Sequence, residues 1–189
     1  MGEQYQTMDG FLRTFIEKQH LFFVATAPLD GTGHLNLSPK GLDTLRILDS
    51  RQIAYLDQVG SGAETIAHIR ENGRIVMMFC AFDGPPKVVR LHGLGQVVEP
   101  PDDSWTALRG HFPSNSGARA IIRIDIHRIS DSCGFGIPEY HFMRQRAQLP
   151  AWITRKGEDG LRSYQRENNS HSVDGLPALR WVANQSGRE

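Results

Sequence analysis

The sequence predicts a mainly β protein, an antiparallel barrel with peripheral helices. Three observations support this fold class. About six short apolar or alternating segments are separated by tight turns, as in all-β proteins. The helical segments are few and do not alternate regularly with strands, which argues against a parallel βαβ sheet. Glycines interrupt the longest strand at Gly93 and Gly95, as expected at a barrel corner or where another backbone approaches closely. We favour a barrel over a sandwich because closure removes exposed strand edges.

The first third of the chain is expected to form one helix and four strands. Apolar residues recur at helical spacing from Asp9 to Gln19. Short apolar runs then indicate strands, and Pro39 is expected to end the second of them because proline lacks a backbone N–H. A polar turn at Asp49 and Ser50 joins the last two as a hairpin. The four strands are expected over residues 21–26, 36–38, 45–48 and 52–56.

The middle of the chain adds two short helices and three more strands. The helix is expected over residues 63–72, with Asn72-Gly73 as its C-terminal stop. Alternation in the last strand places Ile122 and Ile124 on one face and Arg123 on the other. The strands are expected over residues 74–80, 87–98 and 120–129, with a short helix at 102–109.

The character of the chain changes after residue 130. A glycine-containing loop is followed by a polar helical region at 150–169, which Gly157 and Gly160 are expected to divide into two short helices. The polar tail after Pro177 is expected to lack fixed structure. We therefore divide the chain into a barrel domain with an N-terminal helix, residues 1–130, and a C-terminal part of a loop and short helices, residues 131–189, that packs on the barrel or on a partner.

Composition excludes several classes of partner. The 189 residues contain 21 basic and 21 acidic side chains, so capture of nucleic acid through net charge is not expected. The sequence contains no run of about 20 apolar residues and no signal peptide at the start, which predicts a cytoplasmic protein without a membrane span. Cys80 and Cys133 are expected to be free thiols, and the eight histidines show no metal-ligand spacing.

The segment Gly60-Ser61-Gly62 is the most informative candidate site, because it lies where a strand meets a helix. Helix N-termini offer unpaired N–H groups to phosphates, and glycines allow close approach. Ser61 and Glu64 also fit a capping box, which needs no ligand and is the simpler interpretation of this unit alone. A Rossmann interpretation is weaker, because Thr65 stands where G-x-G-x-x-G needs glycine and the next strand begins too soon.

Two further segments contain candidate ligands. Lys40 follows the strand at Asn36, and Arg90 shares a strand face with His92. Taken alone, the segment with Lys40 is typical of the turn at the end of a strand. The pair Arg90 and His92 is typical of a strand face that contacts water.

Together these segments resemble the pyridoxamine 5′-phosphate oxidase-like family of FMN-binding split barrels. The resemblance covers about residues 9–130 and rests on the order of several short motifs. The motifs are Asn36-Leu37-Ser38-Pro39-Lys40-Gly41, Tyr55-Leu56-Asp57 with Gly60-Ser61-Gly62-Ala63-Glu64-Thr65, Glu71-Asn72-Gly73-Arg74-Ile75, and Phe79-Cys80-Ala81-Phe82 leading to Arg90-Leu91-His92-Gly93-Leu94-Gly95.

The resemblance implies a split barrel that forms a homodimer, with FMN in grooves between the subunits and a small molecule as substrate or electron donor. It places four residues at the phosphate, namely Ser61, Gly62, Glu64 and Thr65. Three residues would lie along the isoalloxazine edge, namely Asn36, Ser38 and Pro39. Two basic residues would lie near the flavin, namely Lys40 and Arg90.

This sequence also departs from the family. The oxidases have basic residues where Glu64 and Thr65 stand, so hydroxyls and backbone are expected to bind the phosphate here. The Trp followed by Arg-Leu-x-Pro that holds pyridoxal phosphate is missing, since Trp181 precedes Val182-Ala183-Asn184-Gln185, so vitamin B6 oxidation is not implied. The loop 133–138 is expected to cross the dimer interface and cover the flavin, with Phe135 or Trp152 near the ring.

Two functions follow from the resemblance. The first is an FMN-dependent oxidoreductase of unknown substrate, in which the flavin performs the redox chemistry and no catalytic side chain is identified. The second is a flavin- or haem-binding module without its own turnover.

Overall fold

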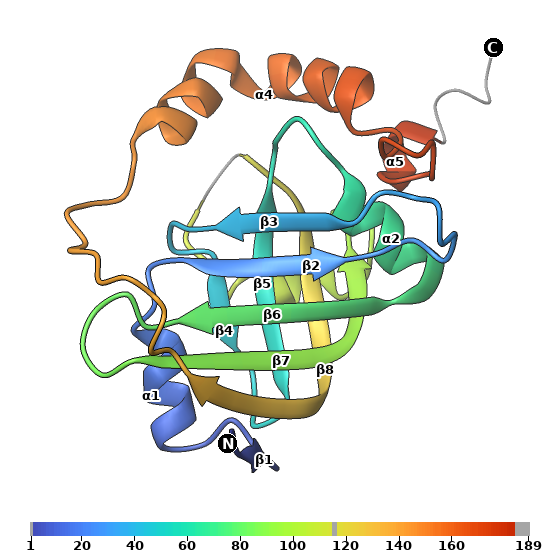
Figure 1. The fold of residues 1–189 in the computed structure, drawn as a ribbon. Helices are drawn as coiled ribbons and strands as arrows, with labels where there is room; N and C mark the ends of the chain where they lie inside the picture. The colour runs from blue at the N-terminus through green and yellow to red at the C-terminus, as the bar shows by residue number, and fades with distance from the viewer. Residues whose placement is uncertain (1, 115–116, 184–189) are drawn as a thin grey trace.

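A single antiparallel sheet forms most of the molecule in a computed structural model that describes residues 2–114 and 117–183 (Figure 1). Its eight strands run in the order β3-β2-β6-β7-β8-β5-β4, and β1 pairs with the far end of β8. The strands are β1 (Gln4–Tyr5), β2 (Phe22–Thr26), β3 (Asn36–Lys40), β4 (Leu45–Ile47), β5 (Gln52–Gln58), β6 (Arg74–Cys80), β7 (Lys87–Val98) and β8 (Ala118–Cys133). The curled antiparallel sheet confirms the predicted split-barrel class and excludes the Rossmann interpretation.

The helices cover the ends of the barrel (Figure 1). They are α1 (Phe11–Glu17), α2 (Glu64–Asn72), α3 (Trp105–Arg109), α4 (Gln148–Asn168) and α5 (Arg180–Ala183). Gly73 ends α2 in the left-handed conformation, with φ of 72°, as its sequence position predicted. Within the described ranges, no helix is both long enough and apolar enough to cross a membrane.

Alternating strand residues form the core between the sheet and α2. Val24, Met77 and Leu91 point inward from β2, β6 and β7, while their strand neighbours are partly exposed. Gly93 allows β7 and β8 to approach closely, because a Cβ there would lie 2.5 Å from the Asp125 carbonyl oxygen. The register of the pair also shifts at this point, between His92 and Gly93. The predicted close approach at this glycine is therefore confirmed.

Pro39 differs from the prediction, because it lies within β3 instead of ending it. It pairs with Phe23, and the strand continues to Lys40. The strand tolerates the proline because β3 is at the edge of the sheet, where one side of the backbone has no ladder partner.

The C-terminal part wraps back over the barrel (Figure 1). Gly157, with φ of 63°, divides α4 as predicted, but Gly160 stays helical. Ile153 and Leu161 of α4 pack on Val59, beside the candidate turn. The expectation of an unstructured tail is wrong for residues 178–183, because Leu179 and Val182 are buried in the main core. Their apolar side chains outweigh the polar character of the surrounding sequence.

Candidate functional site

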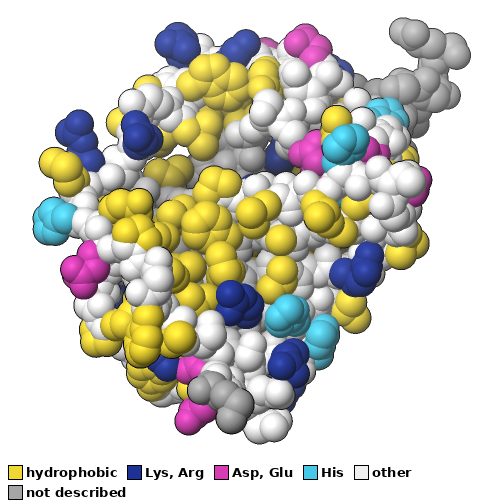
Figure 2. All heavy atoms as spheres, in the orientation of Figure 1, with side chains coloured by type: hydrophobic (Ala, Val, Ile, Leu, Met, Phe, Trp, Pro, Cys, Tyr) yellow, Lys and Arg dark blue, Asp and Glu magenta, His cyan; other side chains and the backbone are white. Residues whose placement is uncertain are grey.

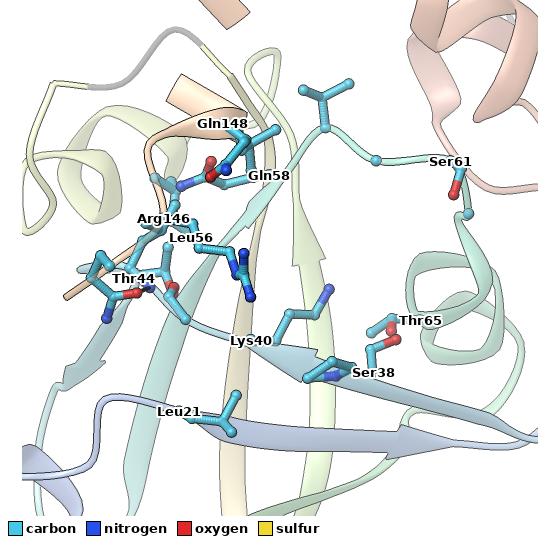
Figure 3. Close-up of a pocket in the computed structure, with 18 of the residues that line it drawn as sticks. Leu21, Ser38, Lys40, Thr44, Leu56, Gln58, Ser61, Thr65, Arg146 and Gln148 are labelled. Atoms are coloured by element: carbon cyan, nitrogen blue, oxygen red, sulfur yellow. Dashed lines mark hydrogen bonds between the residues drawn. The ribbon is translucent and has the colours of Figure 1, made fainter. Parts of the chain in front are cut away.

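A cleft of about 790 Å³ opens between the edge of the sheet and the C-terminal part (Figures 2 and 3). Its walls come from β3, the end of β5, the turn 60–62, the start of α2 and the segment 142–149. This volume lies within the range of small-molecule pockets, about 300–1,000 Å³. The cleft therefore gathers the first two sequence-predicted segments into one site.

Strand alternation sends three polar side chains of β3 toward the cleft. Asn36, Ser38 and Lys40 are half-buried, whereas Leu37 and Pro39 are exposed on the outer face, although Pro39 also contributes to the rim. A period of two residues is the geometry of any strand, so one pleated face presents all three.

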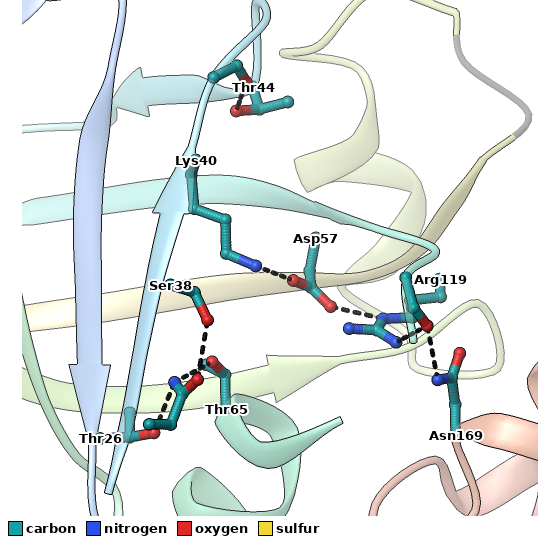
Figure 4. Close-up of polar contacts among 11 residues, drawn as sticks. Thr26, Ser38, Lys40, Thr44, Asp57, Thr65, Arg119 and Asn169 are labelled. Carbon is teal, nitrogen blue, oxygen red and sulfur yellow. Dashed lines mark hydrogen bonds and ion pairs between the residues drawn. The ribbon is translucent and has the colours of Figure 1, made fainter. Parts of the chain in front are cut away.

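Asn36 lines the cleft and is the centre of a hydrogen-bond network whose other members, Thr26, Ser38 and Thr65, are labelled in Figure 4. Its Nδ2 donates to Oγ1 of Thr26 at 3.1 Å and to Oγ1 of Thr65 at 2.9 Å. Its Oδ1 accepts from Oγ of Ser38 at 2.7 Å. The Ser38 hydrogen is thereby committed, so the Ser38 oxygen can accept from a ligand. The Thr65 hydroxyl accepts a hydrogen bond from Asn36 in the same network.

A buried histidine extends this network into the core. Oγ1 of Thr26 lies 2.9 Å from Nδ1 of His68, whose side chain is fully buried. Nε2 of His68 has no hydrogen-bond partner among the described residues. Burial lowers the pKa of His68, so the ring is neutral near pH 7. The network therefore supports Asn36 without placing a charge beneath the cleft.

The start of α2 corrects the capping-box interpretation. The N-cap is Ala63, and no side chain caps the helix. Ser61 lies two residues before it and makes no hydrogen bond to any residue that the structure describes. The first-turn N–H groups are therefore available to an anion, and the helix dipole favours negative charge at the same place.

Glu64 folds its carboxylate back over this turn. Its Oε1 accepts from the Val173 backbone N–H at 3.3 Å. A Cβ built on Gly62 would lie 2.2 Å from Oε2 of Glu64, so residue 62 must be glycine while the carboxylate stays there. Like charges repel, so Glu64 can assist a phosphate only through its backbone N–H.

A buried carboxylate links the two walls of the cleft. Asp57, fully buried at the end of β5, accepts from Nζ of Lys40 at 3.2 Å and from Nε of Arg119 at 2.7 Å (Figure 4). Burial opposes ionisation, but the charges of Arg119 and Lys40 outweigh it and hold the pKa of Asp57 below its ordinary value. The carboxylate thus holds both cations at the cleft.

Positive charge predominates in the cleft. Arg144 and Arg146 from the C-terminal part join Lys40 and Arg119, giving four cations against the carboxylates of Asp57 and Glu64. Such a balance favours an anionic ligand in a partly desolvated site.

Arg90 lies away from this cleft. Its guanidinium donates to Oγ of Ser132 at 3.0 Å. The strand register places it on the outer face in one row with Met78, Phe23 and Pro39. Within one chain, the structure therefore does not bring Arg90 to the other candidate residues.

Phe135 and Trp152 are expected near the flavin of a dimer, and this stays a prediction because the structure holds one chain. Within that chain, Phe135 is 83% exposed and Trp152 packs against Tyr164. Phe142 lines the cleft instead and stacks on His20, with ring centroids 3.7 Å apart.

Sequence reasoning assigned no role to Asp57, Arg119, Gln58 or the two C-terminal arginines. A signal was present for two of them. Asp57 follows four apolar residues of β5, and Arg119 stands between Ala118 and Ala120. A lone charge in a buried strand requires a partner, so this pattern could have indicated the ion pair.

The curled antiparallel sheet and the cationic cleft at an uncapped helix together define a split-barrel protein whose cleft is suited to a small anion. Residues 8–133 match the family described as pyridoxamine 5′-phosphate oxidase. The chain is also 39% identical over 194 residues to the pyridoxamine 5′-phosphate oxidase family protein ustO of Aspergillus flavus, covering 93% of this chain and 77% of that protein. The chain therefore belongs to the pyridoxamine 5′-phosphate oxidase family.

Solved structures support the same fold. HupZ of Group A Streptococcus superposes with a TM-score of 0.52 at 20% identity, covering 66% of this chain and 99% of HupZ. A protein of Lactobacillus delbrueckii, provisionally assigned to the pyridoxamine 5′-phosphate oxidases, superposes with a TM-score of 0.50 at 17% identity. It covers 67% of this chain and 98% of its own length.

Proposed function

We propose that this protein binds FMN in the cleft and acts as a flavin-dependent oxidoreductase on a small molecule. One observation supports the proposal above the others. An uncapped helix start and a polar strand face open onto the same cationic cleft, which is the arrangement that a ligand with a phosphate end and a polar ring end requires.

The phosphate end of FMN would lie at the turn 60–62. Ser61 offers a hydroxyl and a backbone N–H, and Thr65 offers a hydroxyl whose oxygen is already used by Asn36. Lys40 supplies a cation from the adjacent strand. We name FMN in preference to FAD because the sequence resembles FMN-binding split barrels, and the titration below compares the two.

The ring end would lie along β3 and β5. Oε1 of Gln58 is buried at the cleft wall without a hydrogen-bond partner among the described residues. A buried polar atom left in this state is costly, and a ligand donor or a bridging water would relieve it. Ser38 offers an acceptor nearby, as derived above, so the residues present fit a flavin that has both donors and acceptors on its ring edge.

We propose that two copies of the chain assemble as a homodimer. Apolar side chains from β2, β3 and β6 gather on the outer face of the sheet, next to the cleft (Figure 2). Contiguous exposed apolar surface of this kind is typical of protein interfaces. Arg90 and Pro39 share this face, so a partner copy would bring such residues toward the cleft. The apolar residues are Phe23, Ala25, Leu35, Leu37, Val76 and Met78.

The bound flavin would supply hydride transfer, while the protein binds and orients it. The electron donor and the substrate are proposed to be small molecules that reach the ring through the open side of the cleft. We place this activity in the cytoplasm, where Cys80 and Cys133, both free in the structure, would remain reduced.

The test is titration of the apoprotein with FMN, riboflavin and FAD, followed by visible absorbance and flavin fluorescence. We expect FMN to bind most tightly and the protein to turn yellow. A protein that takes up none of the three flavins would overturn the proposal. Reduction of the bound FMN by NADPH or NADH, with reoxidation by an added acceptor, would support the oxidoreductase assignment. Stable FMN binding without reduction by either would instead support a binding module without turnover.

A further inference from the structure

The turn 60–62 is held from behind by a part of the chain that lies outside the family match. Residues 169–179 form a compact hairpin after α4, with a bridge between His171 and Pro177. The family match ends at residue 133. This hairpin contacts the backbone of the turn at Gly60 and the side chain of Glu64, the first residue of α2.

Asn169 makes the contact between the hairpin and the backbone of the turn. Its side chain is fully buried, and Nδ2 donates to the Gly60 carbonyl oxygen at 2.9 Å (Figure 4). A guanidinium nitrogen of Arg119 donates weakly to the same oxygen at 3.4 Å. Oδ1 of Asn169 has no partner in the part of the chain that the structure describes. Burial of an amide with half of its hydrogen-bonding capacity unused is costly, so the contact with Gly60 is the feature that accounts for asparagine here.

The carbonyl of Gly60 fixes the next N–H. The described peptide bonds are all trans, and in a trans peptide the C=O and the following N–H point in opposite directions. With the Gly60 oxygen directed at Asn169, the Ser61 N–H is directed away from the hairpin. Ser61 lines the cleft, and its N–H makes no hydrogen bond to a described residue. A peptide flip would turn the carbonyl toward the anion and remove this donor.

The same hairpin restrains the Glu64 carboxylate, whose negative charge beside the turn is unfavourable to a phosphate. The Val173 N–H donates to Oε1 of Glu64 at 3.3 Å. The hairpin is itself anchored to the barrel, because Oδ1 of Asp174 lies 2.6 Å from Nδ1 of His34. One anchored segment therefore contacts the Gly60 carbonyl and the Glu64 carboxylate, on either side of Ser61.

We propose that Asn169 is a positioning residue for the phosphate of the bound nucleotide, acting through the Gly60–Ser61 peptide. The inference rests on the proposed FMN site and deepens it. Asn169 acts on the phosphate end alone, and riboflavin has the same ring as FMN but no phosphate. Replacing Asn169 should therefore weaken the binding of FMN and leave that of riboflavin nearly unchanged.

Asn169→Leu is the main variant. Leucine has a similar shape and removes the donor together with the unpartnered Oδ1, so the variant is expected to fold. We expect the FMN dissociation constant to rise about tenfold, as for loss of a hydrogen bond to a charged group, while that of riboflavin changes less than about twofold. The measurement is fluorescence titration of each apoprotein with both flavins, beside its melting temperature.

Asn169→Asp and Ser172→Ala complete the set. Aspartate keeps the shape of asparagine but faces the Gly60 carbonyl with an acceptor, so Asn169→Asp should weaken FMN binding at least as much as Asn169→Leu does. If Asn169 only filled space, the leucine variant would lose more FMN affinity than the aspartate variant. Ser172 accepts a hydrogen bond from the Leu176 N–H within the hairpin and does not touch the turn. Its alanine variant should leave the FMN-to-riboflavin affinity ratio unchanged.

The outcomes separate the two claims. If the wild-type apoprotein binds neither flavin, the FMN assignment fails and the role of Asn169 fails with it. If the wild type prefers FMN but Asn169→Leu keeps the same affinity ratio, only the role of Asn169 is refuted. An equal loss for FMN and riboflavin would also refute it, because the residue would then support the whole cleft.

Discussion

The buried carboxylate of Asp57 offers the sharpest test of how the cleft is built. Asp57→Asn keeps the shape of the side chain but leaves Lys40 and Arg119 without a counter-charge. Removing one partner of a buried ion pair costs about 3–5 kcal/mol. Lys40 is 22% exposed and can regain water, whereas Arg119 is only 5% exposed. We therefore expect the lower end, about 3 kcal/mol, which corresponds to a melting temperature about 6–12 °C lower for a chain of this size.

The assay is urea unfolding of wild type, Asp57→Asn and the matched control Asp43→Asn. Asp43 pairs with Arg46, but its side chain is 66% exposed, so its loss should cost about 1 kcal/mol or less. The low folded-state pKa of Asp57 means that its contribution is complete above the unfolded pKa, about 4, and is lost as pH falls through the folded pKa. The deficit of Asp57→Asn should accordingly narrow below about pH 4. A deficit no larger than that of Asp43→Asn, or one independent of pH, would refute the reasoning.

Three further predictions concern the turn, the buried histidine and the end of α2. Ser61→Ala should weaken FMN binding about tenfold without changing the melting temperature. Thr65→Ala should lower both the FMN affinity and the melting temperature, because Thr65 also holds Asn36. An equal decrease in melting temperature for the two variants would contradict this. Because burial lowers the folded pKa of His68, stability should fall as pH drops below about 6.5, and His68→Leu should reduce that fall in urea titrations at pH 7 and pH 5. Gly73→Ala should cost about 1 kcal/mol in thermal unfolding, since φ is 72° at this C-cap; a neutral effect would show that another conformation serves equally well.

Local pattern was sufficient for most of the fold. Periods of two and 3.6 residues predicted the bounds of β7 and α2 closely, because the centre of β7 alternates between buried and exposed residues and the apolar stripe of α2 is buried. The prediction that Pro39 ends its strand failed, since strand order in the sheet decides whether a missing N–H matters. The tail failed for a similar reason, as burial of Leu179 depends on where the barrel leaves space.

The site was predicted in its segments but not in its charge arrangement. Short motifs were enough to identify Lys40 and Ser61. Lys40 is a cation directly after a predicted strand, and Ser61 is a hydroxyl between two glycines before a predicted helix. The pairing of Asp57 with Arg119 joins residues that are 62 positions apart, and no local pattern sets such a distance. Arg144 and Arg146 lie just before α4, so their place at the cleft depends on the long-range packing of α4 against Val59.

The proline in β3 has a consequence for how the sheet meets other molecules. An edge strand with free N–H and C=O groups invites a further strand to join it, which is the usual beginning of aggregation. Pro39 removes one of these donors, and the neighbouring Lys40 adds a charge that such a join would have to bury. Backbone pairing across this edge is therefore discouraged. Pro39, expected only to end a strand, also hinders the addition of a further strand at the edge of the sheet.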